Sequence, residues 1–112
     1  MKLACVKPDS LYAYVDVATG ERSSTLTPGG LGRLIGRRLK FDAADPAQGV
    51  FFLSLADGSA TQVELVGENL PSKQIFGVPA LPAGDYELEV RSTLNSGEEL
   101  RKGRLKATLT VA

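Results

Sequence analysis

The 112-residue sequence contains no histidine and no tryptophan, and it has only one cysteine and one methionine. The absence of histidine excludes catalytic triads that use His, zinc sites with His ligands and imidazole switches near neutral pH. A single cysteine excludes an internal disulfide and multi-cysteine metal clusters. The remaining carboxylates, lysines and tyrosines form no recognisable catalytic motif. We therefore expect a protein that is not an enzyme and holds no cofactor.

The sequence also lacks an excess of charge and a long hydrophobic run. Thirteen Lys and Arg balance thirteen Asp and Glu, so any site for a polyanion must be a local patch. No stretch approaches the roughly 20 apolar residues of a membrane span. Lys7, Pro8 and Asp9 interrupt the short apolar N-terminus before it reaches the length of a secretion signal. We expect a soluble protein, with the cytoplasm as the favoured compartment.

The composition that is present is typical of one small globular domain. Hydrophobic residues make up 43% of the sequence and charged residues 23%, which are ordinary values for a folded protein. The length suits a single domain. We expect an N-terminal extension at residues 1–10 and one domain at residues 11–112.

Several short segments alternate hydrophobic and polar residues with a period of two, which is typical of strands with one buried face. In the clearest segment, Tyr86, Leu88 and Val90 alternate with charged residues. A mostly apolar run at residues 50–55 predicts a more deeply buried strand, which the turn residues Asp57 and Gly58 connect to an alternating segment. Further predicted elements are strands at residues 11–17, 23–27, 62–66, 74–78 (an edge strand) and 105–111, and a turn at residues 95–97.

Residues 31–41 fit either a helix or a strand. The helix would place four apolar residues at helical spacing: Leu31, Leu34, Ile35 and Leu39. Gly32 and Gly36 would then lie inside it, at a cost of roughly 1 kcal/mol each relative to alanine. The strand would place Leu31, Ile35, Leu39 and Phe41 on one face and would bend at Gly36. We favour the strand, and the whole pattern then predicts an all-β, Ig-like antiparallel β-sandwich of about seven to eight strands.

Two sequence motifs resemble known families. Residues 26–32 (LTPGGLG), followed by Ile35-Gly36 and residues 39–42 (LKFD), resemble the Thr-Pro-x-Gly-Gly…Ile-x-Gly opening of IPT/TIG immunoglobulin-like modules. Together with residues 45–52 (DPAQGVFF) and 78–90 (VPALPAGDYELEV), that stretch resembles a bacterial domain family of unknown function with an Ig-like fold. The resemblance spans most of the chain, from about Leu11 to Val111, and implies an IPT/TIG-type sandwich. Members of the family often lie C-terminal to an HU-like DNA-binding domain, and the resemblance implies no catalytic residue.

Basic residues form two clusters in the sequence, and together they are a candidate polyanion-binding site. The clusters are Arg33, Arg37, Arg38 and Lys40 in the first half, and Arg101, Lys102, Arg104 and Lys106 near the end. If they were adjacent on one sheet face, each phosphate they neutralised would make binding more sensitive to salt. Basic side chains on strands also commonly protect sheet edges, and this alternative stays open.

Two further constellations have a functional and an ordinary interpretation. Tyr12 and Tyr14 lie two residues apart, so on a strand both rings face the same way and could stack on a sugar, or both could lie half-buried in the core. Two acidic pairs, Asp42 with Asp45 and Glu98 with Glu99, offer oxygen ligands for a cation without the spacing of a dedicated loop. We favour turn formation and a solvated loop as the role of these pairs.

The sequence thus predicts a non-catalytic interaction or spacer module. Strand edges and end loops of an Ig-like sandwich would contact another protein or a neighbouring domain. DNA or polyanion binding through the basic clusters and carbohydrate binding through exposed tyrosines are the alternatives.

Overall fold

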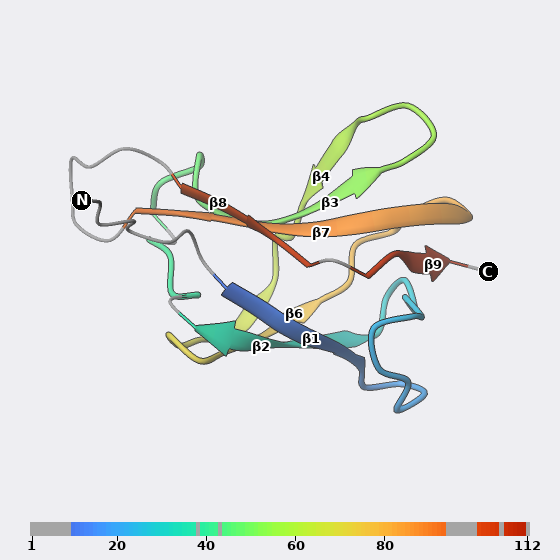
Figure 1. Ribbon diagram of the computed structural model, residues 1–112, viewed down its shortest axis with the longest axis horizontal. Coiled ribbons are helices and arrows are strands. Elements are labelled where there is room, and N and C mark those ends of the chain that lie inside the picture. The colour runs from blue at the N-terminus through green and yellow to red at the C-terminus, as the bar shows by residue number, and fades with distance from the viewer. Residues whose placement is uncertain (1–9, 38, 43, 94–100, 106, 112) are drawn as a thin grey trace, which may run out of the picture.

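The computed structural model describes residues 10–37, 39–42, 44–93, 101–105 and 107–111. This part of the chain contains nine strands and no helix, arranged as two layers (Figure 1). The strands are β1 (Ser10–Asp16), β2 (Leu31–Arg37), β3 (Gly49–Ser54), β4 (Ala60–Gln62), β5 (Val66–Asn69), β6 (Lys73–Gly77), β7 (Gly84–Ser92), β8 (Arg101–Arg104) and β9 (Leu109–Val111). The all-β sandwich predicted from the sequence is confirmed. Residues 1–9 of the extension predicted at residues 1–10 lie outside the described residues, whereas Ser10 already belongs to β1. The turn predicted at 95–97 also lies outside the described residues.

Each layer is an antiparallel sheet. The first sheet has the strand order β1-β2-β6-β5, and the second has the order β4-β3-β7-β8, with β9 also pairing with β7. The predicted hairpin at Asp57-Gly58 is confirmed, because β3 pairs antiparallel with β4 across it. Gly58 has a φ of 75°, a conformation that favours glycine at this turn.

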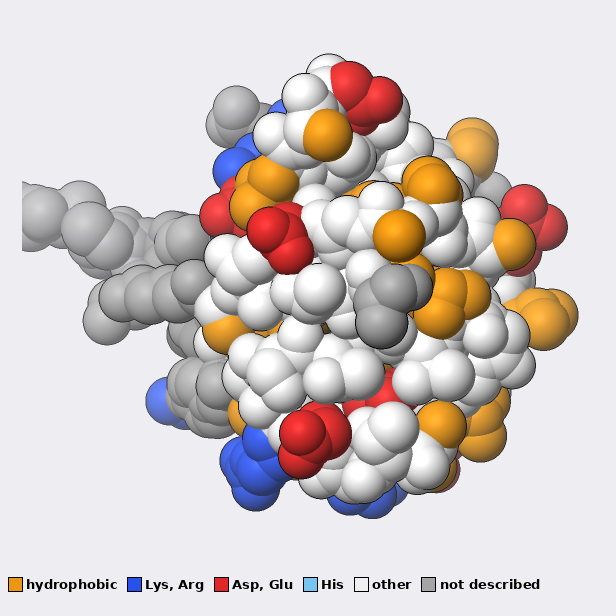
Figure 2. Space-filling view, turned by 90° about the vertical axis from the view of Figure 1, so that its right-hand side faces the viewer, with side chains coloured by type: hydrophobic (Ala, Val, Ile, Leu, Met, Phe, Trp, Pro, Cys, Tyr) orange, Lys and Arg blue, Asp and Glu red, His pale blue; other side chains and the backbone are white. Residues whose placement is uncertain are grey.

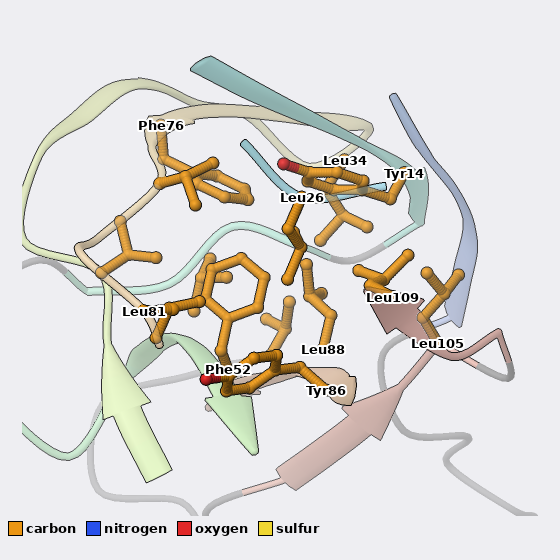
Figure 3. Close-up of a cluster of buried hydrophobic side chains, with 14 of the residues drawn as sticks. Tyr14, Leu26, Leu34, Phe52, Phe76, Leu81, Tyr86, Leu88, Leu105 and Leu109 are labelled. Atoms are coloured by element: carbon orange, nitrogen blue, oxygen red, sulfur yellow. The ribbon is translucent and has the colours of Figure 1, made fainter. Parts of the chain in front are cut away.

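The core between the sheets is built around three aromatic rings. Tyr14 from β1 and Phe76 from β6 meet Phe52 from β3, with ring centroids 6.0 to 6.5 Å apart. All three side chains are fully buried. Aliphatic side chains from both sheets and from the connecting segments, including Leu26 and Leu81, pack around them (Figure 3). Aromatic pairs at such distances add about 0.5–1.5 kcal/mol each beyond simple burial.

Tyr14 reaches this position because Gly32 has no side chain. A Cβ atom on Gly32 would lie 2.4 Å from the Tyr14 hydroxyl oxygen and 2.6 Å from its Cε1 atom. The ring of Tyr14 therefore lies over the backbone of the neighbouring strand β2. The glycine that weakened the helical interpretation of this segment is required here for close packing.

The face of β2 that points into the core is the opposite of the predicted one. Burial alternates so that Gly32, Leu34 and Gly36 face inward, and Leu34 is fully buried, whereas Leu31 is 51% exposed. The register shift of this strand pair lies on β1, between Leu11 and Ala13, opposite Gly36 and Ile35 of β2, so the extra residue of the bulge belongs to β1. The inward side carries two glycines and one leucine, which leaves a weak hydrophobic signal in the sequence.

Three other strand predictions need correction. The segment 62–66 is not one strand, because the chain leaves the second sheet after β4 and joins the first at β5. The strand at 74–78 is not an edge strand, since β6 lies between β2 and β5. The segment 105–111 is interrupted, and β8 and β9 pair separately with β7.

The segment 23–27 forms only isolated bridges in place of the predicted strand. Arg22 bridges Val15 on the free edge of β1, and Thr25 bridges Thr110. Asp16, fully buried at the end of β1, holds this segment in place. Its Oδ2 atom accepts hydrogen bonds from the hydroxyls of Thr19 (2.8 Å) and Thr27 (2.6 Å). The chain thereby folds back along β1 and covers its edge.

The buried side predicted for β7 is confirmed. Tyr86, Leu88 and Val90 point into the core, and all are at most 3% exposed. The hydroxyl of Tyr86 donates a 2.6 Å hydrogen bond to the carbonyl of Pro82, four residues upstream. This contact has the form of the tyrosine corner found in Ig-like sandwiches, and it fixes the chain where it enters the strand.

We predict that Gly32→Ala destabilises the fold by about 1–3 kcal/mol, because the new methyl group overlaps the Tyr14 ring in a closely packed core. Tyr14→Phe should cost little, since the Tyr14 hydroxyl is buried without a hydrogen-bond partner in the structure. Urea unfolding followed by circular dichroism measures both effects.

The matched control is Gly67→Ala on β5, where an added Cβ would meet its nearest atom at an ordinary 3.5 Å. Replacing Tyr14 with leucine should also reduce the cost of Gly32→Ala. An equal cost of Gly32→Ala in both backgrounds would show that the tyrosine ring is not the constraint.

Candidate functional site

The outer face of the first sheet carries a row of exposed apolar residues at one end. Val17 donates a backbone hydrogen bond to the carbonyl of Leu31, Leu31 pairs with Gly77, and the N–H of Gly77 donates to the carbonyl of Leu65. Val17, Leu31 and Leu65 are 47%, 51% and 76% exposed. We call Val17, Leu31, Gly77 and Leu65 the apolar row. It crosses the sheet from the end of β1 to the residue before β5.

Figure 2 looks onto the end of the sandwich at which β1 ends and β2 begins. Leu55, which is 50% exposed, follows β3 at the same end, because its backbone N–H bonds to Asp85 at the start of β7. Hydrophobic side chains gather on the right-hand part of this view, while Lys and Arg lie at its margins (Figure 2). Leu70, which joins β5 to β6, lies at the opposite end of the molecule.

Three arginines lie on the same outer face: Arg22 and Arg33 are next to the apolar row, and Arg37 lies at the other end of β2. Arg33 and Arg37 alternate with the inward residues of β2, and Arg22 bridges Val15 on the free edge of β1. All three are exposed, and none has an ion pair or a side-chain hydrogen bond within the described part of the chain. We call Arg22, Arg33 and Arg37 the outer arginines. Arg33 pairs with Val15 on one side and with Ile75 on the other, so apolar side chains flank it.

The outer face of the second sheet has a different electrostatic arrangement, because four of its charged side chains, Glu87, Glu89, Arg91 and Arg104, pair with one another, while Lys102 is exposed there. Glu89, only 2% exposed, accepts hydrogen bonds from Arg91 and from Arg104, and Arg104 also pairs with Glu87. The guanidinium of Arg91 lies 4.0 Å from the ring centroid of Phe51. Burial raises the pKa of Glu89, but the hydrogen bonds and charges of Arg104 and Arg91 more than offset this and hold it below its ordinary value. This network stabilises the sheet, and within it Arg104 is already paired with Glu87 and Glu89.

The structure places the predicted basic residues on opposite sides of the sandwich. Arg33 and Arg37 point outward from the first sheet, whereas Lys102 and Arg104 point outward from the second. Lys40 follows β2 and is exposed. The backbone of Arg101 lies in β8, and Arg38 and Lys106 lie outside the described residues. Arg22 is a further basic residue on the outer face of the first sheet. The sequence pattern did not reveal it, because Arg22 reaches this face only through the bridge to Val15 that forms after a turn.

The exposed-tyrosine alternative is wrong for Tyr14. Its side chain is fully buried in the aromatic core, and burial together with the nearby charge of Asp16 raises the pKa of its phenol. No surface is available there to stack on a sugar. Of the two acidic pairs, Asp42 and Asp45 cap turns, since their carboxylates accept backbone N–H bonds from Ala44 and Ala47. Glu98 and Glu99 lie outside the described residues.

Two searches of the described residues gave negative results. They contain no group of three or more Cys, Asp or Glu placed to hold a metal ion. They also contain no helix with the length and hydrophobicity needed to cross a membrane.

Comparison with known families identifies the domain. Residues 10–106 match the domain of unknown function DUF4469, which has an Ig-like fold. The chain belongs to this family. The match covers both sheets of the DUF4469 domain up to the end of β8, including β2 and the Tyr86 corner. A search of curated proteins gave no match.

Solved structures share the fold of this DUF4469 domain. A presumed bacterial DNA-binding protein from Bacteroides vulgatus superposes with a TM-score of 0.81 at 24% identity, over 96% of this chain and 49% of its own. The domain thus spans about half of that protein. CopC from Methylosinus trichosporium has a TM-score of 0.51 at 16% identity, with 92% of each chain covered. PcoC, a methionine-rich copper resistance protein from Escherichia coli, has 0.52 at 18% identity, over 95% of this chain and all of its own.

We predict that Glu89→Gln lowers the free energy of unfolding by about 1–3 kcal/mol at pH 7, because Arg91 and Arg104 lose a charged acceptor. A carboxyl with a lowered pKa in the folded state stabilises the fold fully above its unfolded pKa of about 4.3. That contribution is lost as the pH falls through the folded pKa. The difference between wild type and variant should therefore shrink below about pH 4.

Urea unfolding at a series of pH values measures this difference. Glu64→Gln is the matched control, because Glu64 is exposed and has no ion pair within the described residues. A difference for Glu89→Gln that stays constant from pH 7 to pH 3 would contradict the assignment.

Proposed function

We propose that this DUF4469 domain is a non-catalytic interaction module of a larger protein, and that it contacts another protein or a neighbouring domain through the outer face of its first sheet. The observation that carries the proposal is the apolar row, with Leu31 and Leu65 more than half exposed and with Arg22 and Arg33 next to the row. Adjacent exposed apolar side chains with arginine at their side are typical of protein interfaces.

The contrast between the two outer faces supports the choice of the first sheet. On the second sheet the outward residues Phe51 and Leu53 are at most 9% exposed, and Arg91 covers the Phe51 ring. On the first sheet Leu31 has no such cover. An aliphatic side chain left in water costs about 25 cal/mol per Å² relative to burial, so a partner that covers the row gains affinity.

The comparisons support a role as one part of a longer chain. The Bacteroides vulgatus protein is about twice as long as this domain and is described as a presumed DNA-binding protein. The resemblance to a family found beside HU-like domains agrees with a module that accompanies a DNA binder. In that arrangement the DUF4469 domain contacts protein, and the neighbouring domain binds DNA. The likeness to the copper resistance protein PcoC is one of fold, and it supports no metal function here, since the chain has no histidine and one methionine.

A photo-crosslinking experiment tests the proposal. The full-length protein that contains this domain is expressed in its native cells with p-benzoylphenylalanine in place of Leu31 or of Leu65. We expect both positions to crosslink to the same partner or to the same neighbouring domain. Leu70, 44% exposed at the opposite end, is the control position and should give no such product.

Leu31→Ser combined with Leu65→Ser should abolish the interaction. The free energy of unfolding should change by less than about 0.5 kcal/mol, as is usual for exposed residues. Thermal unfolding measures the stability, and the crosslink yield is measured from p-benzoylphenylalanine in place of Val17, the remaining exposed side chain of the apolar row, with and without the double substitution. Equal crosslinking from Leu31 and Leu70, or none from any position, would overturn the proposal.

A further inference from the structure

The charges of the two outer faces differ in a way that points to the chemistry of the partner. The second sheet pairs Arg91 and Arg104 with Glu87 and Glu89. The first sheet presents four cations on its outer face, Lys73 and the outer arginines. Among the described residues of its strands, the one carboxylate on this face is that of Glu68, and it pairs with Lys73 at 2.9 Å. The outer face of the first sheet is therefore positively charged, although the chain as a whole is neutral.

Apolar and basic side chains alternate along β2 on this face. Leu31, Arg33, Ile35 and Arg37 succeed one another at every second residue, which spaces them by roughly 6.6 Å. Across the sheet, Leu31 continues into the apolar row and Arg33 lies beside Val15 and Ile75. Each arginine thus has an aliphatic neighbour on the same surface.

This mixture favours a protein partner over a nucleic acid. The phosphate backbone of DNA offers negative charge but no aliphatic surface to cover Leu31 and Leu65. Binding to it also depends on many cations, and the three outer arginines are few for that task. An acidic polypeptide segment supplies carboxylates for the guanidinium groups and apolar side chains for the row.

We propose that the outer face of the first sheet docks an acidic polypeptide segment that alternates carboxylates with apolar side chains. Carboxylates pair with Arg22, Arg33 and Arg37, and the aliphatic side chains of the segment bury the apolar row. This inference rests on the proposed function and adds the chemical class of the partner.

Three labelled probes test it by fluorescence anisotropy with the isolated chain. They are a ten-residue peptide that alternates Glu and Leu, a ten-residue poly-Glu peptide and a 20-base-pair DNA duplex. We expect the alternating peptide to bind at least tenfold more tightly than poly-Glu or DNA, and its affinity to fall as salt rises. Tighter binding of the duplex, or no binding of the alternating peptide up to 1 mM, would overturn the inference.

Charge reversal locates the site. Arg33→Glu combined with Arg37→Glu should weaken peptide binding at least tenfold, because two attractive pairs become repulsive. Lys102→Glu is the control, since Lys102 is exposed on the opposite sheet, and it should change the affinity less than twofold. An equal loss from Lys102→Glu would show non-specific attraction and would overturn the site.

The failure of this inference and that of the proposed function are distinguishable. If Leu31 crosslinks to a specific partner in cells and the double reversal leaves that crosslink unchanged, the interaction module stands and the acidic partner is wrong. If Leu31 and Leu65 crosslink to nothing, the proposed function itself fails, whatever the peptides do.

Discussion

The packing of one aromatic ring over one glycine is the constraint on which the sandwich depends. Tyr14 lies across β2 because Gly32 has no side chain, and from there it meets both Phe76 and Phe52. The triangle joins β1 and β6 of the first sheet to β3 of the second. Since interiors are close-packed, a shift of this ring would displace the other two. The inward side of β2 is thereby fixed, and its outward side carries Leu31 and the arginines.

The two outer faces of the sandwich differ in charge pairing and in the exposure of apolar side chains. On the second sheet Arg91 and Arg104 pair with Glu87 and the nearly buried Glu89, and Arg91 covers Phe51. The first sheet leaves its arginines in water next to exposed aliphatic side chains. The chain is neutral overall, yet most described charges on one outer face form ion pairs, whereas the described arginines on the other form none.

Local patterns predicted the fold well and the surface only in part. The alternation of β7 and the turn chemistry before Tyr86 depend on residues that are neighbours in the sequence, so both could be predicted. The orientation of β2 could not, because Gly32 and Gly36 occupy its inward side and Leu31 and Ile35 its outward side. The cluster around Arg33 was visible along the sequence. The apolar row was not, since its members lie on four segments that only the strand pairing brings together.

The return of the chain along β1 also bears on aggregation. β1 is the longest outer strand of the first sheet, and the bridge between Val15 and Arg22 occupies its free edge. The other outer strands, β4, β5, β8 and β9, have three or four residues each. Among the described residues, the longest outer strand is thus bridged near its C-terminal end and the other outer strands are short. Short or partly bridged outer strands limit the ladder that a strand of another copy can add, which is one way in which β-sandwiches resist cross-β assembly.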